Sequence, residues 1–225
     1  MPSPQAGRDL NDEDDAADGG AESAKAAEGA APARKRPKPG ERRVQILQTL
    51  AAMLEEPGAD RITTAALAAK LQVSEAALYR HFASKAQMFE GLIEFIEQSI
   101  FTLINQITER DTDPALQARR IVFMLLQFGE KNPGMARVMV GDALVFENER
   151  LSARMNQFFD KVESQLRQSL RAAAERAGSQ TPTVDANGRA SALTALAVGR
   201  LQRFTRSGFK RSPTEQIEMA LALLT

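Results

Sequence analysis

The chain has 225 residues, of which 43% are hydrophobic and 26% are charged, so it is long and apolar enough to fold around a sizeable core. It has no cysteine and only one histidine, which excludes disulfides, thiol chemistry and most zinc sites, and we expect neither a metal ion nor a cofactor. No run of about 18 apolar residues is present and the N-terminus is acidic, so we expect a cytoplasmic protein without a membrane anchor.

The first 40 residues are predicted to form a disordered acidic tail followed by a basic arm. Residues 1–33 hold eight acidic and two basic side chains and no aromatic or β-branched residue, so they bury too little surface to offset ordering entropy. Because the whole chain is neutral, the remainder carries a net charge of +6. The arm, RKRPKPGERR at 34–43, is typical of a nucleic-acid contact, but also of a solvated charge run or a localisation signal. Its first four cations are Arg34, Lys35, Arg36 and Lys38.

From Glu41 onward the apolar spacing is helical and no window shows sustained strand alternation, so the predicted fold class is all-α with about nine helices. The first helix is expected to end at Pro57 and Gly58, which disfavour continuation. Its inner face is predicted to hold Val44, Leu47, Ala51 and Leu54.

Two short capped helices follow. Thr63 is predicted to cap the second helix and Ser74 to cap a third that reaches Phe82, with a tight turn at residues 71–73 between them. This pattern matches a helix-turn-helix unit, whose second helix enters the DNA major groove. The glycine that is common in such a turn is missing, and a left-handed Gln72 would cost about 1 kcal/mol. A generic αα-hairpin has the same pattern, but the adjacent basic arm favours DNA binding.

The third helix offers side chains suited to a DNA surface. Leu78 is expected to pack inward, whereas Ala76 and Ala77 allow close approach and contact with a thymine methyl group. Base edges or phosphates are within reach of Ser74, Glu75, Tyr79 and Arg80. Thr63, His81 and Lys85 are assigned to the phosphate backbone, where contacts set register. The only histidine and only tyrosine of the chain are therefore interpreted as parts of one DNA-facing surface.

The rest of the chain is predicted to be a helical bundle. A long fourth helix begins at a capping-box pattern of Ser84 and Gln87 and ends before Asp111. A fifth, Pro114–Lys131, has almost no polar face and should be the central, buried helix. A short helix to Val140, a seventh helix capped by Asp142, a loop at 178–188 and helices at about 189–208 and 213–224 complete the chain. We divide the chain into the tail and arm at 1–40, a helix-turn-helix domain at 41–87 and a helical domain at 88–225.

Phe95, in the fourth helix, falls about 60° outside the apolar stripe at 100° per residue, so it is a candidate binding anchor. Packing against a neighbouring helix would explain it equally simply. In the eighth helix, small residues permit close helix approach and suit a dimer interface: Ala190, Ala192, Ala195, Ala197 and Gly199. Cations near its end are interpreted as a solvated flank: Arg200, Arg203, Arg206, Lys210 and Arg211.

The run ITTAALAAKLQVSEAALYRHFASKAQMF at 62–89, with its YRHF motif, resembles the TetR family of helix-turn-helix regulators. Further segments are similar to the nucleoid occlusion factors within that family: LIEFIE at 92–97, FGEKNPG at 128–134, FE at 146–147, RMNQFFDKVESQLRQSLR at 154–171 and SGFKRSPTE at 207–215. The resemblance covers about residues 41–215. It implies a TetR-like fold, with an N-terminal three-helix DNA-binding domain and a C-terminal bundle whose last two long helices pair in a homodimer.

The resemblance also implies a function. A dimer bound to palindromic double-stranded DNA on the nucleoid would bind the division protein FtsZ and antagonise its assembly, blocking septum formation there. In such factors the FtsZ surface lies along the fourth and fifth helices, and the matching positions are Phe95, Met124, Lys131 and Asn132. Leu103 and Gln127 stand where arginine and glycine are expected, so the groove differs in charge and depth.

Two other functions are open. A TetR-type transcriptional repressor released from its operator by a small-molecule ligand would need an apolar cavity with a few polar groups. The Phe, Met, Leu and Ile residues of the interior helices fit a solidly packed core at least as well as a ligand cavity, so we expect no such ligand. An enzyme would need a nucleophile and a base, and the chain offers no cysteine and no glycine-rich phosphate loop, so we expect no catalytic residues.

Overall fold

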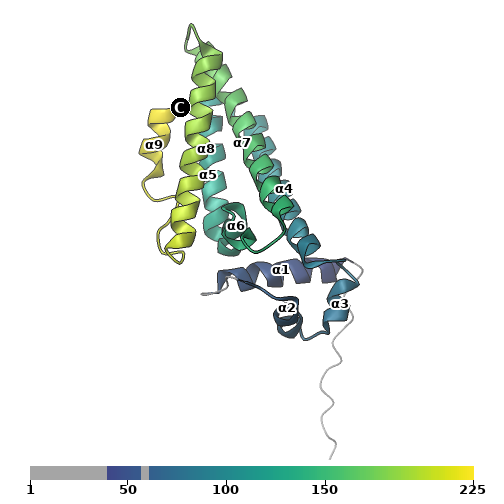
Figure 1. The fold of residues 1–225 in the computed structure, drawn as a ribbon. Coiled ribbons are helices and arrows are strands. Elements are labelled where there is room, and N and C mark those ends of the chain that lie inside the picture. Colours follow the sequence, from purple (N-terminus) through teal and green to yellow (C-terminus); the bar gives the residue numbers. More distant parts are fainter. Residues whose placement is uncertain (1–39, 57–60) are drawn as a thin grey trace, which may run out of the picture. The chain divides into compact units, whose positions relative to one another are not determined.

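The computed structural model describes residues 40–56 and 61–225, which belong to one compact unit. The predicted tail, the four cations from Arg34 to Lys38 and the predicted stop at Pro57 lie outside the described residues. Within the described part, nine α-helices and one 3₁₀ helix are present and no strand, so the all-α prediction is confirmed (Figure 1). None of these helices is both long and apolar enough to span a membrane.

Three helices form the end of the unit that carries the helix-turn-helix: α1 (Glu41–Glu55), α2 (Thr64–Leu71) and α3 (Glu75–Tyr79) (Figure 1). Both predicted caps are confirmed, because Thr63 Oγ1 accepts a hydrogen bond from the backbone N–H of Ala66 at 3.1 Å and Ser74 Oγ accepts one from that of Ala77 at 3.3 Å. Helix α3 is shorter than predicted and stops before Phe82, whose buried ring belongs to the core between the helices.

The inner face of α1 differs in part from the prediction. Val44 is 54% exposed, whereas the buried residues include Ile46 and Leu50 together with the predicted Ala51 and Leu54. Because α1 contacts α2, α4 and α6, its buried sector is broad and is centred about 110° around the helix from Val44. The sequence of α1 has two neighbouring apolar stripes, one that includes Val44 and one that includes Ile46 and Leu50. Contacts with α2, α4 and α6 bury the second stripe.

Helices α4 (Lys85–Arg110) and α5 (Pro114–Lys131) form a hairpin with the predicted boundaries. The cap at the start of α4 is confirmed, since Ser84 Oγ accepts from the N–H of Gln87 at 3.2 Å. Gln87 Oε1 accepts a hydrogen bond from the backbone N–H of Ala83 at 2.9 Å, whereas in a regular capping box the donor is the N–H of the cap residue itself, here Ser84. Helix α5 contacts α4, α6, α7, α8 and α9, which confirms that it is central.

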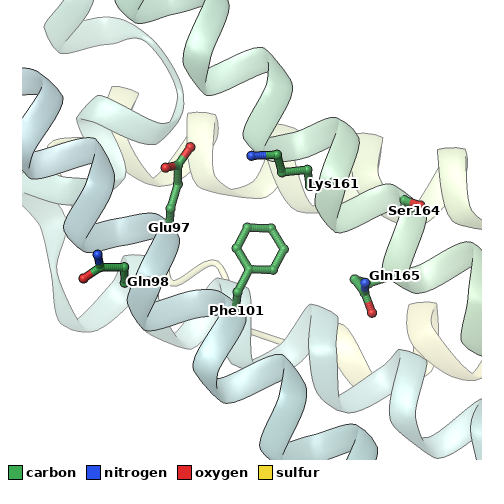
Figure 2. A pocket seen from close by; sticks show the side chains of 6 residues that line it. All are labelled: Glu97, Gln98, Phe101, Lys161, Ser164 and Gln165. Atoms are coloured by element: carbon green, nitrogen blue, oxygen red, sulfur yellow. The ribbon is translucent and has the colours of Figure 1, made fainter.

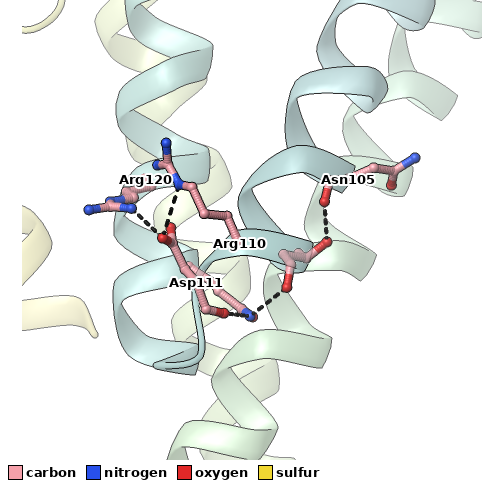
Figure 3. Close-up of polar contacts among 6 residues, drawn as sticks. Asn105, Arg110, Asp111 and Arg120 are labelled. Carbon is pink, nitrogen blue, oxygen red and sulfur yellow. Dashed lines mark hydrogen bonds and ion pairs between the residues drawn. The ribbon is translucent and has the colours of Figure 1, made fainter.

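The turn of this hairpin is held by polar contacts (Figure 3). Gln117 Nε2 donates to the carbonyl oxygens of Thr108 at 3.2 Å and Asp111 at 2.6 Å. The Asp111 carboxylate accepts from Arg110 Nε at 3.4 Å and also pairs with Arg120. These bonds satisfy the backbone carbonyls at the end of α4 and fix the two helices antiparallel to each other.

The prediction that Asp142 caps the seventh helix is wrong. Asp142 begins the 3₁₀ helix η1 (Asp142–Leu144), which follows α6 (Pro133–Met139), and its carboxylate accepts from Thr205 Oγ1 at 2.8 Å. Helix α7 (Glu149–Arg176) is capped instead by Asn148, whose Oδ1 accepts from the N–H of Arg150 at 3.1 Å. The carboxylate is therefore used for a tertiary contact that the local sequence does not reveal.

The predicted loop at 178–188 is also wrong, because α8 (Pro182–Arg206) begins near its middle. Proline is favoured in the first turn of a helix, and the Asp185 carboxylate accepts hydrogen bonds from the Ser179 and Thr181 hydroxyls. These hydrogen bonds lower the pKa of Asp185 below its ordinary value. Ala190 and Ala197, predicted for the dimer interface, are buried within the chain's own bundle.

The last helix, α9 (Ile217–Leu224), is shorter than the predicted 213–224. The left-handed backbone of Gln216, with φ of 51°, stops the helix from beginning earlier. Helices α7 and α8 pack along each other and enclose α5 together with α4 (Figure 1). One continuous cluster of buried apolar side chains extends from α1 to α9.

Candidate functional site

Helix α3 is anchored by one buried residue and exposes the rest. Leu78 is buried, as predicted, and packs against the core of the α1–α4 region. The predicted DNA-facing residues divide into an exposed and a half-buried group, although none is deeply buried. Exposed are Thr63, Ser74, Glu75, Ala76, Tyr79 and Arg80, and half-buried are Ala77 and His81. The five-residue helix thus presents Glu75, Ala76 and Tyr79 to solvent.

Thr64, a residue that sequence analysis did not select, links α2 to this surface. Its Oγ1 donates to Glu75 Oε2 at 2.6 Å and accepts from the Tyr79 hydroxyl at 3.5 Å. The contact holds the Glu75 carboxylate against α2 and orients the Tyr79 ring. The only sequence signal was that Thr64 begins the helix capped by Thr63.

The turn between α2 and α3 has the predicted left-handed residue. Gln72 has φ of 56° and ψ of 47°, and the N–H groups of Gln72 and Val73 donate to the carbonyls of Ala69 and Ala68, both at 3.0 Å. This is a Schellman-type helix ending, for which glycine is usual. The turn therefore keeps its geometry at an energetic cost.

Arg43 fixes the other end of α3. Its Nη1 donates to the backbone oxygen of His81, and its guanidinium lies 4.1 Å from the centroid of the Phe82 ring. Sequence analysis placed this arginine only at the end of the basic arm. Its side chain ties the start of α1 to the segment that joins α3 and α4.

Lys85 has a different environment from the other predicted phosphate contacts. Its ammonium group pairs with Glu147, it lies 5.7 Å from the centroid of the Phe89 ring, and only 24% of the side chain is exposed. The assignment of Lys85 to DNA stays a prediction, and contact with a phosphate would require it to leave Glu147.

Two further ion pairs connect α4 to α7. Arg150 pairs with Glu90 at 2.8 Å and Arg154 with Glu97 at 2.6 Å. The hydrogen bond that Arg154 donates to the Glu97 carboxylate raises the pKa of the guanidinium, which is charged in any case. Together with Lys85–Glu147, these pairs hold the first half of α4 against the bundle.

The predicted partner-binding residues lie along the α4–α5 hairpin. Phe95 is 48% exposed, as its angular position predicted, Lys131 is exposed, and Met124 and Asn132 are half-buried. Phe95 is 15 residues from the end of α4, about 23 Å, and Lys131 is 17 residues from the start of α5, about 26 Å. Because α4 and α5 are antiparallel, Phe95 and Lys131 therefore lie at about the same distance from the hairpin turn, and so does Asn132.

Met124 lies 10 residues into α5, about 15 Å from its start and so about two turns nearer the hairpin turn than Lys131. Leu103 and Gln127, the two departures from the expected residues, are half-buried beside this stretch of the hairpin. The hairpin therefore brings Phe95, Lys131 and Asn132 to one level and leaves Met124 at its edge.

Asn132 is fixed by its position between two helices. It ends α5 and precedes α6, and its Nδ2 donates to the backbone oxygen of Phe128 at 2.8 Å. Among the described residues its Oδ1 accepts no hydrogen bond. The amide is thus oriented while its carbonyl oxygen remains available to a partner.

A hollow between α4 and α7, of about 450 Å³, was tested as the cavity that a ligand-controlled repressor would need (Figure 2). Phe101 projects into it, and the other lining residues are polar or charged: Glu97, Gln98, Lys161, Ser164 and Gln165. It lies open on the surface between two helices. A ligand site is expected to be a concave cavity that encloses most of its ligand, whereas this hollow is open to solvent, so it does not favour the repressor interpretation.

Comparison with known proteins assigns the family. Residues 46–92 match the family described as "Bacterial regulatory proteins, tetR family", and residues 113–225 match the SlmA-like family described as "Tetracyclin repressor-like, C-terminal domain". The nucleoid occlusion factor SlmA of Vibrio vulnificus (strain YJ016) is 52% identical over 189 residues, which are 84% of this chain and 96% of the relative. This chain belongs to the SlmA family of nucleoid occlusion factors.

Other members agree with this assignment. SlmA of Salmonella typhi is 51% identical over 184 residues, covering 81% of this chain and 92% of the relative. Among solved structures, the transcriptional regulator FadR from Bacillus subtilis in complex with stearoyl-CoA has a TM-score of 0.65 at 14% identity, covering 80% of this chain and 96% of that chain. At this identity the likeness shows the fold alone. SlmA proteins thus have the TetR-type fold, and this family is one of DNA-binding regulators rather than of enzymes.

Proposed function

We propose that this protein is a nucleoid-associated homodimer that binds palindromic DNA through α3 and, when bound, binds FtsZ and prevents its assembly into a septum. Membership of the SlmA family supports the biological role, and the observation that carries the partner surface is the exposed Phe95 of α4 at the same level of the hairpin as Lys131 and Asn132 of α5. The proposed FtsZ surface then lies near the junction of the bundle with the helix-turn-helix region, because Asn132 leads into α6 and α6 contacts α1.

The DNA-binding step is supported by the geometry of α3. Tyr79 and Arg80 are exposed side by side with the small Ala76, so the helix can enter a groove without a steric barrier. Thr63 and Ser74, already used as helix caps, retain hydroxyl hydrogens that can be donated to phosphates. The recognition helices of a dimer would lie about 34 to 36 Å apart, or a multiple of this, which requires a palindromic site.

Dimerisation is supported by the outer face of α8. At helical spacing this face is lined by small exposed or half-exposed residues: Val184, Gly188, Ser191, Ala192, Ala195 and Gly199. A Cβ atom added at Gly188 or Gly199 would meet no atom within 4 Å. Open space over a smooth helix face leaves room for close approach of the equivalent helix of a second copy.

FtsZ binding is supported by the chemistry of the hairpin surface. An exposed aromatic side chain at the level of a cation and an oriented amide has the composition of an interface anchor, because aromatic residues dominate binding energy once desolvated. Lys131 would attract an acidic segment, and the Asn132 carbonyl would accept a backbone N–H of that segment.

The test is sedimentation of FtsZ polymers with full-length protein, with and without a duplex selected from a random library. Phe95→Ala should leave duplex binding unchanged and raise the concentration needed to reduce the FtsZ pellet by about 30-fold, which corresponds to about 2 kcal/mol. Met219→Ala is a matched control, because Met219 is an exposed apolar side chain that lies on α9 rather than on α4 or α5. If the DNA-bound protein leaves the FtsZ pellet unchanged, the proposal fails.

A further inference from the structure

A second polar feature lies at the C-terminal end of α8 and belongs neither to α3 nor to the hairpin surface. A pocket of about 220 Å³ is lined by Arg200, Arg203, Arg211, Ser212, Pro213, Glu215 and Gln216, and it is called the arginine pocket below. Three guanidinium groups and one carboxylate line it, so its lining carries a net charge of +2. Sequence analysis interpreted these arginines as a solvated flank.

The segment Ser207–Gln216, which forms one wall, has an unusual backbone. Among the described residues only three non-glycine residues have positive φ: Gln72, Phe209 at 64° and Gln216 at 51°. Gln72 lies in the helix-turn-helix turn, and the other two lie within this wall, Gln216 at its end. Such conformations persist only when their surroundings enforce them, and they concentrate at functional sites.

Several contacts enforce this conformation. Ser207 Oγ accepts from the backbone N–H groups of Lys210 at 3.1 Å and Arg211 at 2.9 Å. At the far end, the hydroxyl of Thr214 donates to the Glu130 carboxylate of α5 at 2.7 Å, and the hydroxyl of Ser212 donates to the same carboxylate. The wall is therefore fixed both to α8 and to the central helix.

The three arginines are in different states. Arg200 Nη1 donates to the backbone oxygens of Pro213, at 3.3 Å, and Glu215, so this side chain supports the wall. The side chains of Arg203 and Arg211 form no hydrogen bond or ion pair with any described residue. Two guanidinium groups on a fixed frame, with donors unused, are suited to bidentate recognition of a phosphate.

The size and position of the pocket limit what it holds. A drug-sized ligand needs roughly 300 to 1,000 Å³, so a pocket of about 220 Å³ suits a phosphate group whose carrier remains outside. At 100° per residue, Arg200 lies about 130° and Arg203 about 70° around α8 from the middle of the small-residue face, so the pocket lies to one side of that face, with Arg203 nearest to it.

We propose that the arginine pocket binds the terminal phosphate of a small soluble phosphorylated ligand, such as a nucleoside polyphosphate, through Arg203 and Arg211. Binding is non-covalent and does not depend on the proposed FtsZ surface. The same chemistry could be supplied by a backbone phosphate of DNA, and the experiment separates the two sources.

The experiment is calorimetric titration of the full-length protein with inorganic pyrophosphate at physiological ionic strength. Arg203→Gln and Arg211→Gln should each weaken binding by about 10- to 100-fold, as expected for loss of a charge-assisted hydrogen bond. Arg206→Gln is the matched control, since Arg206 is an exposed arginine at the same end of α8 that does not line the pocket. It should change the affinity less than about twofold, because the affinity resides in hydrogen bonds rather than in diffuse charge.

A second titration uses random duplex DNA. Arg203→Gln and Arg211→Gln should leave duplex affinity within about twofold of the unmodified protein, because the duplex binds at α3. The proposal is overturned if pyrophosphate does not bind, if Arg206→Gln weakens its binding as much as Arg211→Gln, or if duplex affinity falls together with pyrophosphate affinity. Failure of the FtsZ test would leave all of these readings unaffected.

Discussion

The helix-turn-helix region and the bundle hold their helices in place by different means. Helices α2 and α3 have eight and five residues, and α3 buries only Leu78. Helices α4, α7 and α8 have 26, 28 and 25 residues, and α7 alone buries eight. Short helices are unstable alone and depend on individual caps and anchors, whereas long ones are stabilised by burial spread over many turns. A single lost hydrogen bond should therefore matter more for DNA reading than for the bundle.

The largest expected effect comes from breaking the contact between the two regions. A Cβ atom at Gly134, in α6, would lie 2.0 Å from the backbone oxygen of Ala51 in α1. Gly134→Ala should lower the free energy of unfolding by about 3 kcal/mol, since backbone must move to accept the methyl group. Urea denaturation measures this loss. A loss below about 1 kcal/mol would show that α1 and α6 separate easily.

Removing one cap in each region compares them directly. Ser74→Ala and Asn148→Ala each remove a capping acceptor, which typically contributes about 1 kcal/mol. In α3 this loss should unwind the first turn and reduce duplex affinity about fivefold, whereas in α7 duplex affinity should not change. Fluorescence anisotropy with a selected duplex measures both. Equal losses in the two variants would contradict the proposed difference.

A stabilising change should be possible at the helix-turn-helix turn. Gln72→Gly should raise the free energy of unfolding by about 0.5 to 1 kcal/mol, because glycine adopts φ near 56° without steric cost. Thermal denaturation measures the gain, and duplex affinity should be retained. As control, Ala69→Gly in the interior of α2 should destabilise by a similar amount. A Gln72→Gly variant that is less stable would mean that the glutamine side chain contributes more than the strain costs.

The smallest expected effect concerns the start of α8. Hydrogen bonds from Ser179 and Thr181 lower the pKa of Asp185 below its ordinary value of 3.8. The stabilisation is therefore complete above about pH 4 and is lost as pH falls through the lowered pKa in the folded protein. The hydrogen-exchange protection factor of the first turn of α8, which is the intrinsic exchange rate divided by the observed rate at the same pH, should fall in this acid range, and Asp185→Asn should remove that dependence. A protection factor that stays constant down to pH 2 would refute this role.

The sequence predicted best what local chemistry decides. Thr63, Ser74 and Ser84 act as caps because a short hydroxyl side chain and the following N–H group are close in sequence. The bounds of α5 were also predicted, since proline begins it and the Asn132–Pro133 pair ends it. The exposure of Phe95 followed from helical periodicity alone.

What depends on distant partners was missed. Asp142 is drawn to Thr205, 63 residues away, and so does not cap α7. Gly188 was interpreted as part of a loop, but burial of Ala186 and Ala190 on the other face keeps the helix intact around it. At the surface of α3, Thr64 and Arg43 gain their contacts only when α1, α2 and α3 are brought together. No periodicity in the sequence contains that information.

The close approach of α6 to α1 has a mechanical consequence. Where two helices meet through long side chains, rotamer changes let one tilt without moving the other. At Gly134 the backbones of α6 and α1 are in direct contact, so no side chain between them can adjust its rotamer. A rotation of α1 must be passed to α6 almost undiminished, and from there to Asn132 and the hairpin. The α1–α6 contact is therefore stiff. The orientation in which the two helix-turn-helix regions meet a duplex then depends on the packing of the whole bundle.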